Sequence, residues 1–214
     1  MIAEPDRDDP LARVLGRARE LGFLGPGPVQ AHIDHALAFG EAYREVSGGV
    51  EPADFVDIGC GGGVPGLVLA REWREAKVVL VDSMVRRTAI LERAVDELGM
   101  AGRCHVVTAR VEYLGRRDGR EAASLVTARG FAGPAVTAEC AAGLLKVGGW
   151  LVVSEPPEAN ATQGRWDQDG LHALGFGRPV PLDDGFRFVG LKKIRTVDER
   201  FPRRVGIPSK RPLW

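Results

Sequence analysis

Hydrophobic residues follow two different patterns along the chain. In the first 50 residues they recur with the 3.6-residue period of an α-helix, once over residues 11–21 and again over residues 29–45. Asp9 can accept hydrogen bonds from the free N–H groups at the first helix start, and Pro10 suits the first helical position. We expect residues 1–50 to form an N-terminal helical cap.

From residue 54 onward, short apolar runs alternate with amphipathic stretches, which is typical of a parallel sheet built from strand–helix units. Seven strands are predicted, at residues 54–58, 77–81, 103–108, 124–128, 150–154, 178–182 and 186–194. Helices are predicted between them at residues 64–74, 84–98, 111–116, 135–145 and 166–174. The turn at residues 183–185 is too short for a crossover helix, so the last two strands should pair antiparallel. A mainly parallel seven-stranded sheet with one reversed strand is the α/β plan of class I, Rossmann-like methyltransferases, here over residues 51–195.

Length and composition are those of an ordinary globular protein. The chain has 214 residues, of which 44% are hydrophobic and 27% are charged, which fits a single compact domain. No apolar run approaches the roughly 18 residues of a membrane helix, and residues 1–10 are acidic and polar where a signal peptide would be basic and then apolar. We therefore expect a cytoplasmic monomer that does not associate with membranes.

Cysteine and histidine residues do not indicate a metal site or a disulfide. Cys60, Cys104 and Cys140 include no C-x-x-C pair, so we interpret them as small apolar residues. His32 and His35 are three residues apart in the second predicted helix, but no cluster of carboxylates or cysteines completes a site. A surface position or packing within the cap is the favoured interpretation of both histidines.

The formal net charge of zero conceals a basic C-terminal segment. Residues 186–214 contain nine basic and two acidic residues, a net charge of +7, which leaves −7 for the rest of the chain. A basic tail over residues 196–214 could contact phosphates. The alternative is a solvated basic face, and charge alone does not separate the two.

A glycine-rich loop follows the first predicted strand. The run from Asp57 to Gly66 reads D-I-G-C-G-G-G-V-P-G and leads into a predicted helix. Glycines suit a loop that turns sharply and lets a cofactor lie against bare backbone. Gly61, Gly63 and Gly66 also fit the dinucleotide fingerprint, so the glycines alone leave NAD open. Asp57 favours S-adenosylmethionine, because a carboxylate there suits the cationic amino group of the methionine moiety and repels a pyrophosphate.

Acidic residues also follow the next two strands. Asp82 ends the second strand, where a carboxylate can accept hydrogen bonds from both ribose hydroxyls, or can instead cap the following helix. Val111 and Glu112 follow the third strand, where the adenine ring would lie, and a surface carboxylate is the alternative for Glu112. With the glycine loop, these residues predict a site for S-adenosylmethionine.

Further stretches are more specific than the glycine loop alone. They are the V-P-G ending of that loop, L-V-D-S at residues 80–83 with Arg86, Arg87 and Leu91, R-V-E at 110–112, A-R-G-F-A at 128–132 and F-P-R-R-V-G-I-P-S-K-R-P-L at 201–213. Together they resemble the glucose-inhibited division protein B family, the ribosomal small-subunit RNA guanine-N7 methyltransferases. The resemblance covers most of the chain after about residue 32. It implies a methyl-donor site at Asp57, Gly59, Gly61, Asp82 and Glu112, and an active-site arginine at Arg129.

The chain departs from this family on the substrate side. The family's Asn-Leu-Thr element is not found in the N-terminal region, where His32 and Asp34 are a loose counterpart of its His and Asp pair. Ser154 and Glu155 replace the family's Lys-Gly after the fifth strand. This replacement places a negative charge where a cation would face RNA.

These residues lead to one main hypothesis and two alternatives. Methyl transfer to guanine N7 requires no general base, and Arg129 could orient the base unless it pairs with Glu155 or Asp57. Arg203, Arg204 and Lys210 are the predicted contacts to RNA phosphates. The main hypothesis is S-adenosylmethionine-dependent methylation of guanine N7 in 16S ribosomal RNA of the small ribosomal subunit. The alternatives are methylation of a small molecule or a protein, and a cofactor-binding protein without transferase activity.

Overall fold

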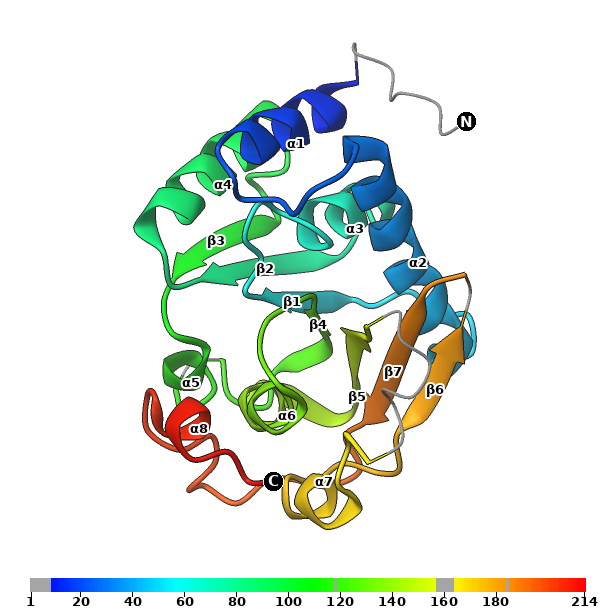
Figure 1. Cartoon of the computed structure of the whole chain (residues 1–214), viewed down its shortest axis with the longest axis vertical. Helices are drawn as coiled ribbons and strands as arrows, with labels where there is room; N and C mark the ends of the chain where they lie inside the picture. The colour runs from blue at the N-terminus through cyan, green and yellow to red at the C-terminus, as the bar shows by residue number, and fades with distance from the viewer. Residues whose placement is uncertain (1–8, 118, 157–163, 184) are drawn as a thin grey trace.

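Seven strands form one sheet with helices on both faces in the computed structural model, which describes residues 9–117, 119–156, 164–183 and 185–214 (Figure 1). Residues 1–8 of the expected cap and Asp184 of the expected turn lie outside the described residues. The strands are β1 (Asp54–Ile58), β2 (Lys77–Asp82), β3 (Cys104–Thr108), β4 (Ala123–Ala128), β5 (Leu145–Ser154), β6 (Val180–Asp183) and β7 (Arg187–Lys192). The helices are α1 (Pro10–Glu20), α2 (Val29–Ser47), α3 (Gly66–Glu72), α4 (Val85–Glu97), α5 (Val111–Leu114), α6 (Pro134–Ala142), α7 (Gln168–Ala173) and α8 (Ile207–Lys210).

The strand order is β3-β2-β1-β4-β5-β7-β6. Strands β1 to β5 pair in parallel, whereas β7 is antiparallel to both β5 and β6. The predicted α/β sheet with one reversed strand is therefore confirmed. Strand β5 begins at Leu145, five residues earlier than predicted. Leu145 pairs with Ala123 of β4, and after a shift in register the pairing resumes between Trp150 and Leu125.

Alternation along the strands divides the core into two layers. Phe55, Val78 and Leu80 face α1 to α4, whereas Ile58 and Val81 face the side of α5 to α7, as the helices above and below the sheet show in Figure 1. All three cysteines are buried without a disulfide, in line with their interpretation as small apolar residues. None of the described helices is long and apolar enough to span a membrane.

The two N-terminal helices share the first core layer with the sheet. Asp9 accepts a hydrogen bond from the N–H of Leu11 at 3.1 Å, so α1 begins as its sequence predicts. Helix α2 contacts α3, β5 and β7. Between α1 and α2, the elbow formed by residues 21–28 crosses the glycine loop. A Cβ on Gly62 would lie 2.7 Å from the side chain of Leu24. Because Gly62 has no side chain, Leu24 of the elbow can pack directly against the glycine loop.

The C-terminal segment packs against the body of the protein. Val197 and Phe201 are buried, and their carbonyls accept hydrogen bonds from Arg120. Trp214 covers Gly170, where a Cβ would lie 2.2 Å from the indole. The four-residue helix α8 was not predicted, because it is too short to show a helical period.

Candidate active site

The glycine loop lies at the carboxyl end of β1, the edge at which ligands of open α/β sheets bind. Gly59 and Gly61 have φ angles of +69° and +53°, a backbone region that glycine occupies without strain. The N–H groups of Gly59 and Cys60 donate to the carbonyl of Val81 at 2.8 and 3.1 Å. These bonds tie the loop to β2, and Gly59 and Gly61 both line cavities at this edge.

Gly63 and Gly66 contribute to packing instead. A Cβ on Gly63 would lie 2.4 Å from Leu67, and one on Gly66 would lie 2.3 Å from Leu80. Any larger residue would therefore push α3 away from the sheet. Their predicted part in cofactor binding stays a prediction.

Asp57 faces the loop rather than a cavity. Its carboxylate accepts hydrogen bonds from the N–H of Gly66 and the hydroxyl of Thr127, both at 2.9 Å, and the residue is 1% exposed. Burial raises the pKa of Asp57 to about 7, although these two hydrogen bonds lower it in part. These bonds hold the loop to β4, and the contact of Asp57 with a cationic amino group stays a prediction.

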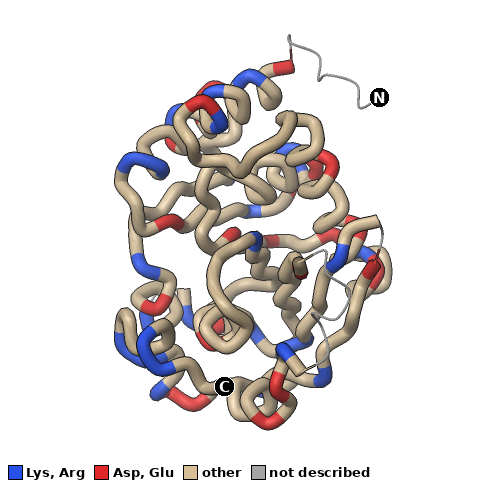
Figure 2. Tube along the Cα trace, in the orientation of Figure 1, with Lys and Arg blue, Asp and Glu red and all other residues tan. Residues whose placement is uncertain are grey.

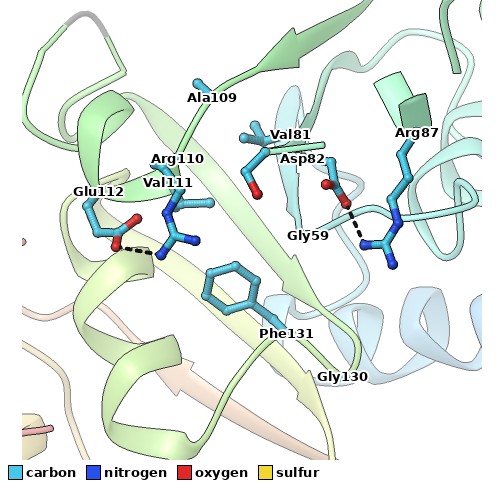
Figure 3. Close-up of a pocket in the computed structure, with 11 residues that line it drawn as sticks. Gly59, Val81, Asp82, Arg87, Ala109, Arg110, Val111, Glu112, Gly130 and Phe131 are labelled. Carbon is cyan, nitrogen blue, oxygen red and sulfur yellow. Dashed lines mark hydrogen bonds and ion pairs between the residues drawn. The ribbon is translucent and has the colours of Figure 1, made fainter. Parts of the chain in front are cut away.

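A first cavity opens between the glycine loop and the ends of β2 and β3 (Figure 3). Its lining includes Gly59, Asp82, Arg87, Val111, Glu112 and Phe131. Asp82 is 4% exposed and accepts hydrogen bonds from the N–H of Met84 at 2.9 Å and of Gly61 at 3.1 Å. Arg87 donates to the same carboxylate at 3.2 Å, so Asp82 is fixed at the cavity wall.

Glu112 is held at the far side of this cavity. It is 1% exposed and accepts hydrogen bonds from Arg110 and from the N–H of Gly206, both at 3.0 Å. Burial alone would raise the pKa of Glu112, but the bonds from Arg110 and Gly206 hold it below its usual value. Glu112 is thus a buried carboxylate that links α5 to the C-terminal segment, not a surface residue.

The cavity suits a nucleoside with an amino-acid extension. Asp82 keeps a lone pair on Oδ1 beyond its bond to Met84, which a ribose hydroxyl can use. Val111 provides an apolar wall on the side where an adenine ring would lie. The residues present therefore fit S-adenosylmethionine, and their individual roles remain predictions.

Arg129 follows β4 and lies between two more cavities. It lines a second cavity with Thr137, Glu155 and Trp166, and a third beside the glycine loop and the elbow. Its Nη2 lies 2.8 Å from Nδ1 of His32. Burial lowers the pKa of Arg129, whereas the charge of Asp57 raises it.

Glu155 faces into the protein. Its side chain is 2% exposed, its Oε1 accepts a hydrogen bond from the indole of Trp166 at 3.1 Å, and Nε of Arg165 lies 3.4 Å from its Oε2. The negative charge that was predicted to face RNA is therefore not on the open surface of the protein. Glu155 instead places a buried carboxylate in the wall of the second cavity.

His35 is half-buried in the cap and lines the second cavity. Its ring contacts the rings of Phe39, Phe186 and Phe188. Burial lowers the pKa of His35 to about 4, with a smaller contribution from the charge of Arg129. The ring is therefore neutral near pH 7.

The three predicted RNA contacts differ in their surroundings. Lys and Arg positions gather around α5 and α8 (Figure 2), and Arg204 and Lys210 are exposed there. Arg203 is instead paired with Glu139, which is 1% exposed at its side chain, through bonds of 2.6 to 3.1 Å from Nε and Nη2. We revise the interpretation of Arg203 to a structural ion pair, because its guanidinium is already engaged.

Sequence reasoning placed Phe131 and Arg87 in stretches that resemble the family but assigned them no role in the site. Phe131 separates the first and second cavities, and its ring lies over Gly59. Arg87 could have been suspected, because it follows Asp82 within the first turn of α4. The contact between His32 and Arg129 joins residues 97 positions apart, and no local pattern marks it.

The family model for rRNA small subunit methyltransferase G matches residues 29–165, which include the glycine loop, Asp82, Glu112 and Arg129. The chain belongs to this family. The resemblance inferred from the motifs is thereby confirmed, although the match ends before the C-terminal segment.

Curated relatives in the rRNA small subunit methyltransferase G family are moderately similar. The protein from Parasynechococcus marenigrum is 33% identical over 175 residues, covering 74% of this chain and 66% of its own length. That from Rubrobacter xylanophilus is 36% identical over 167 residues, covering 73% of this chain and 64% of its own. The chain therefore spans just under two thirds of the length of these two relatives.

Solved structures support the same fold for this family member. A SAM-dependent O-methyltransferase from Thermotoga maritima has a TM-score of 0.59 at 13% identity, covering 86% of this chain and 72% of its own. A methyltransferase from Geobacter sulfurreducens has a TM-score of 0.55 at 16% identity, covering 88% and 90%. At such identities the similarity establishes the class I fold.

Proposed function

We propose that the chain is an S-adenosylmethionine-dependent methyltransferase that modifies guanine N7 of 16S ribosomal RNA. Its partner is the small ribosomal subunit, on which it acts as a monomer. Membership of the rRNA small subunit methyltransferase G family supports this proposal. The named activity of the relatives supports the choice of ribosomal RNA.

The observation that carries the proposal is the sharing of walls between two cavities. Gly130 and Phe131 line both the first cavity, which suits the methyl donor, and the second, which contains Arg129. A base held in the second cavity would thus lie next to a donor in the first. This adjacency is what a transfer between two bound molecules requires.

The proposed reaction makes modest demands on the side chains. When bound, S-adenosylmethionine supplies a methyl group on a positively charged sulfur, which is already electrophilic. The N7 lone pair forms the new bond as the bond from carbon to sulfur breaks, and guanine becomes cationic without losing a proton. Asp82 holds the donor in place, and Arg129, which can only donate hydrogen bonds, orients the base through O6 and leaves N7 free.

The test compares Arg129→Lys with the parent protein. Lysine keeps the charge but loses the planar fork of the guanidinium. The barrier to methyl transfer should therefore rise by about 2 to 4 kcal/mol, which lowers the rate roughly 30-fold to 1000-fold. The binding of S-adenosylhomocysteine should stay within a few-fold of the parent. Transfer is measured on small subunits from cells that lack the modification, with 7-methylguanosine counted by mass spectrometry.

Arg178→Lys is the matched control, because Arg178 is exposed on the surface. Transfer by the parent to another nucleotide, or to none, would refute the proposed substrate. Weak S-adenosylhomocysteine binding by Arg129→Lys would assign Arg129 to the donor site. Undiminished transfer by the same variant would remove it from the reaction.

A further inference from the structure

His32 lies at the centre of a short chain of hydrogen bonds. It is 5% exposed on α2, and its Nδ1 lies 2.8 Å from Nη2 of Arg129. Its Nε2 lies 3.1 Å from the carbonyl oxygen of Gly25 in the elbow. One imidazole therefore bridges Arg129 and the segment that crosses the glycine loop.

The two partners of His32 fix the position of its proton. A guanidinium can only donate, so Nδ1 must accept from Arg129. A carbonyl oxygen can only accept, so Nε2 must carry the proton that it donates to Gly25. The chain of bonds is complete only while the ring is neutral and has its proton on Nε2.

Each bond of His32 reaches a different part of the site. Arg129 lines the second cavity, where we place the base. The elbow residues Phe23, Leu24 and Gly25 line the third cavity together with Gly59 and Gly61. Displacing the elbow would thus disturb the glycine loop, whereas displacing Arg129 would disturb the second cavity.

We propose that His32 is a positioning residue, which aims the guanidinium of Arg129 into the second cavity and anchors the elbow over the glycine loop. This inference rests on the proposed function. His32 does not touch the reacting atoms itself. Displacing a positioning group by about 1 Å can lower the reaction rate on the order of a hundredfold. The rate of turnover therefore depends on the orientation of the Arg129 guanidinium.

Two substitutions separate the two bonds. His32→Asn places an amide oxygen near the position of Nδ1, so it keeps an acceptor for Arg129 but does not reach Gly25. His32→Gln places its amide near the position of Nε2, so it keeps the bond to Gly25 but withdraws the acceptor from Arg129. His105→Gln and His105→Asn serve as matched controls, because His105 is exposed on β3.

We expect one variant to lose turnover and the other to lose cofactor affinity. In His32→Gln, kcat for transfer to unmodified small subunits should fall by about tenfold to a hundredfold, with the Kd of S-adenosylhomocysteine unchanged. In His32→Asn, kcat should stay within about threefold, and the Kd of S-adenosylhomocysteine should rise several-fold. The free energy of unfolding, measured in urea, shows whether either variant has lost its fold.

The pH profile provides a readout that a merely structural role would not change. Burial lowers the pKa of His32 below its usual value, the bond to Gly25 raises it, and the charges of Arg129 and Arg19 lower it further. His35 lies beside the same guanidinium, and Asp57 faces it from β1. Protonation of His32 would set two cations against each other, so turnover in the parent should fall on the acidic side of the ordinary pKa of histidine. The same acidic decline should be absent from His32→Asn, which cannot titrate there.

The outcomes are distinct from those that test the proposed function. A parent that transfers no methyl group to the subunits overturns both the proposed function and this inference. An active parent, with His32→Asn and His32→Gln equally impaired in kcat, overturns the inference alone. An acidic decline that persists unchanged in His32→Asn does the same, because it would then belong to another group such as Asp57.

Discussion

Arg203 and Arg204 are neighbours in sequence, but the structure gives them opposite surroundings. The guanidinium of Arg203 closes on Glu139, whose side chain is 1% exposed, while the side chain of Arg203 is 24% exposed. Glu139 also accepts the backbone N–H of Arg203 at 2.7 Å. Arg204 is exposed on the surface. Replacing each with alanine therefore tests which arginine holds the protein together and which is available to RNA.

The expected loss in Arg203→Ala follows from the burial of its partner. Removing one member of a buried ion pair costs about 3 to 5 kcal/mol, because the remaining charge stays buried without compensation. We take about 3 kcal/mol, since Arg203 is partly exposed and the backbone bond to Glu139 survives. The unfolding entropy of a chain of 214 residues is roughly 0.45 kcal/mol/K. The expected fall in Tm is therefore about 7 °C, against about 1 °C for Arg204→Ala.

Urea unfolding and thermal melting of both variants provide the assay. Glu139→Gln in the Arg203→Ala background should recover part of the loss, because it removes the uncompensated charge. RNA binding is measured in parallel across a range of salt. Arg204→Ala should reduce the slope of the logarithm of the RNA association constant against log salt by about 0.7 to 0.9. Arg203→Ala should leave this slope unchanged. The ion pair would be refuted if Arg203→Ala lowered the Tm as little as Arg204→Ala does and also reduced the salt slope of RNA binding. Arg203 would then be a phosphate contact, as the sequence predicted.

The remaining predictions concern two buried carboxylates. Because the folded state raises the pKa of Asp57 from 3.8 to about 7, the native protein holds a proton that the unfolded chain has lost between these pH values. The free energy of unfolding should thus decrease by roughly 3 kcal/mol as pH rises from 4 to 7, of which roughly 2 kcal/mol falls between pH 5 and pH 7. Asp57→Asn should remove this contribution in urea titrations at those two pH values. If the free energy of unfolding of Asp57→Asn depended on pH as steeply as that of the parent, the raised pKa would not belong to Asp57. Asp82→Asn should keep an acceptor for the loop but weaken S-adenosylhomocysteine binding about tenfold or more by calorimetry; unchanged affinity would place the ribose elsewhere.

Local patterns in the sequence were sufficient for the fold. The alternation of apolar runs and amphipathic stretches follows from strands and helices that each bury one face, so it can be found without any distant contact. The hairpin of β6 and β7 follows from a connection too short for a helix. The glycine loop was recognisable for the same reason, because Gly59, Gly61 and Gly63 adopt positive φ angles that favour glycine.

The partners of individual side chains were beyond the sequence. Asp57 and Glu112 were identified as important acidic residues, yet the first holds the loop to β4 and the second links α5 to the C-terminal segment. Arg203 resembled every other arginine of the basic segment until its partner on α6 was known. Residue type and charge indicate what a side chain can do, but not which group will face it.

What the sequence by itself determined, then, was the order of elements, the family and the position of the donor loop, all of which depend on residues close together in the chain. Only the tertiary structure decided that His32 bonds to Arg129, that Glu155 is buried and that Arg203 belongs to an ion pair. Each of these contacts joins segments brought together by sheet pairing and helix packing. Their energies depend on burial, which removes competing water and which no local pattern of residues reports.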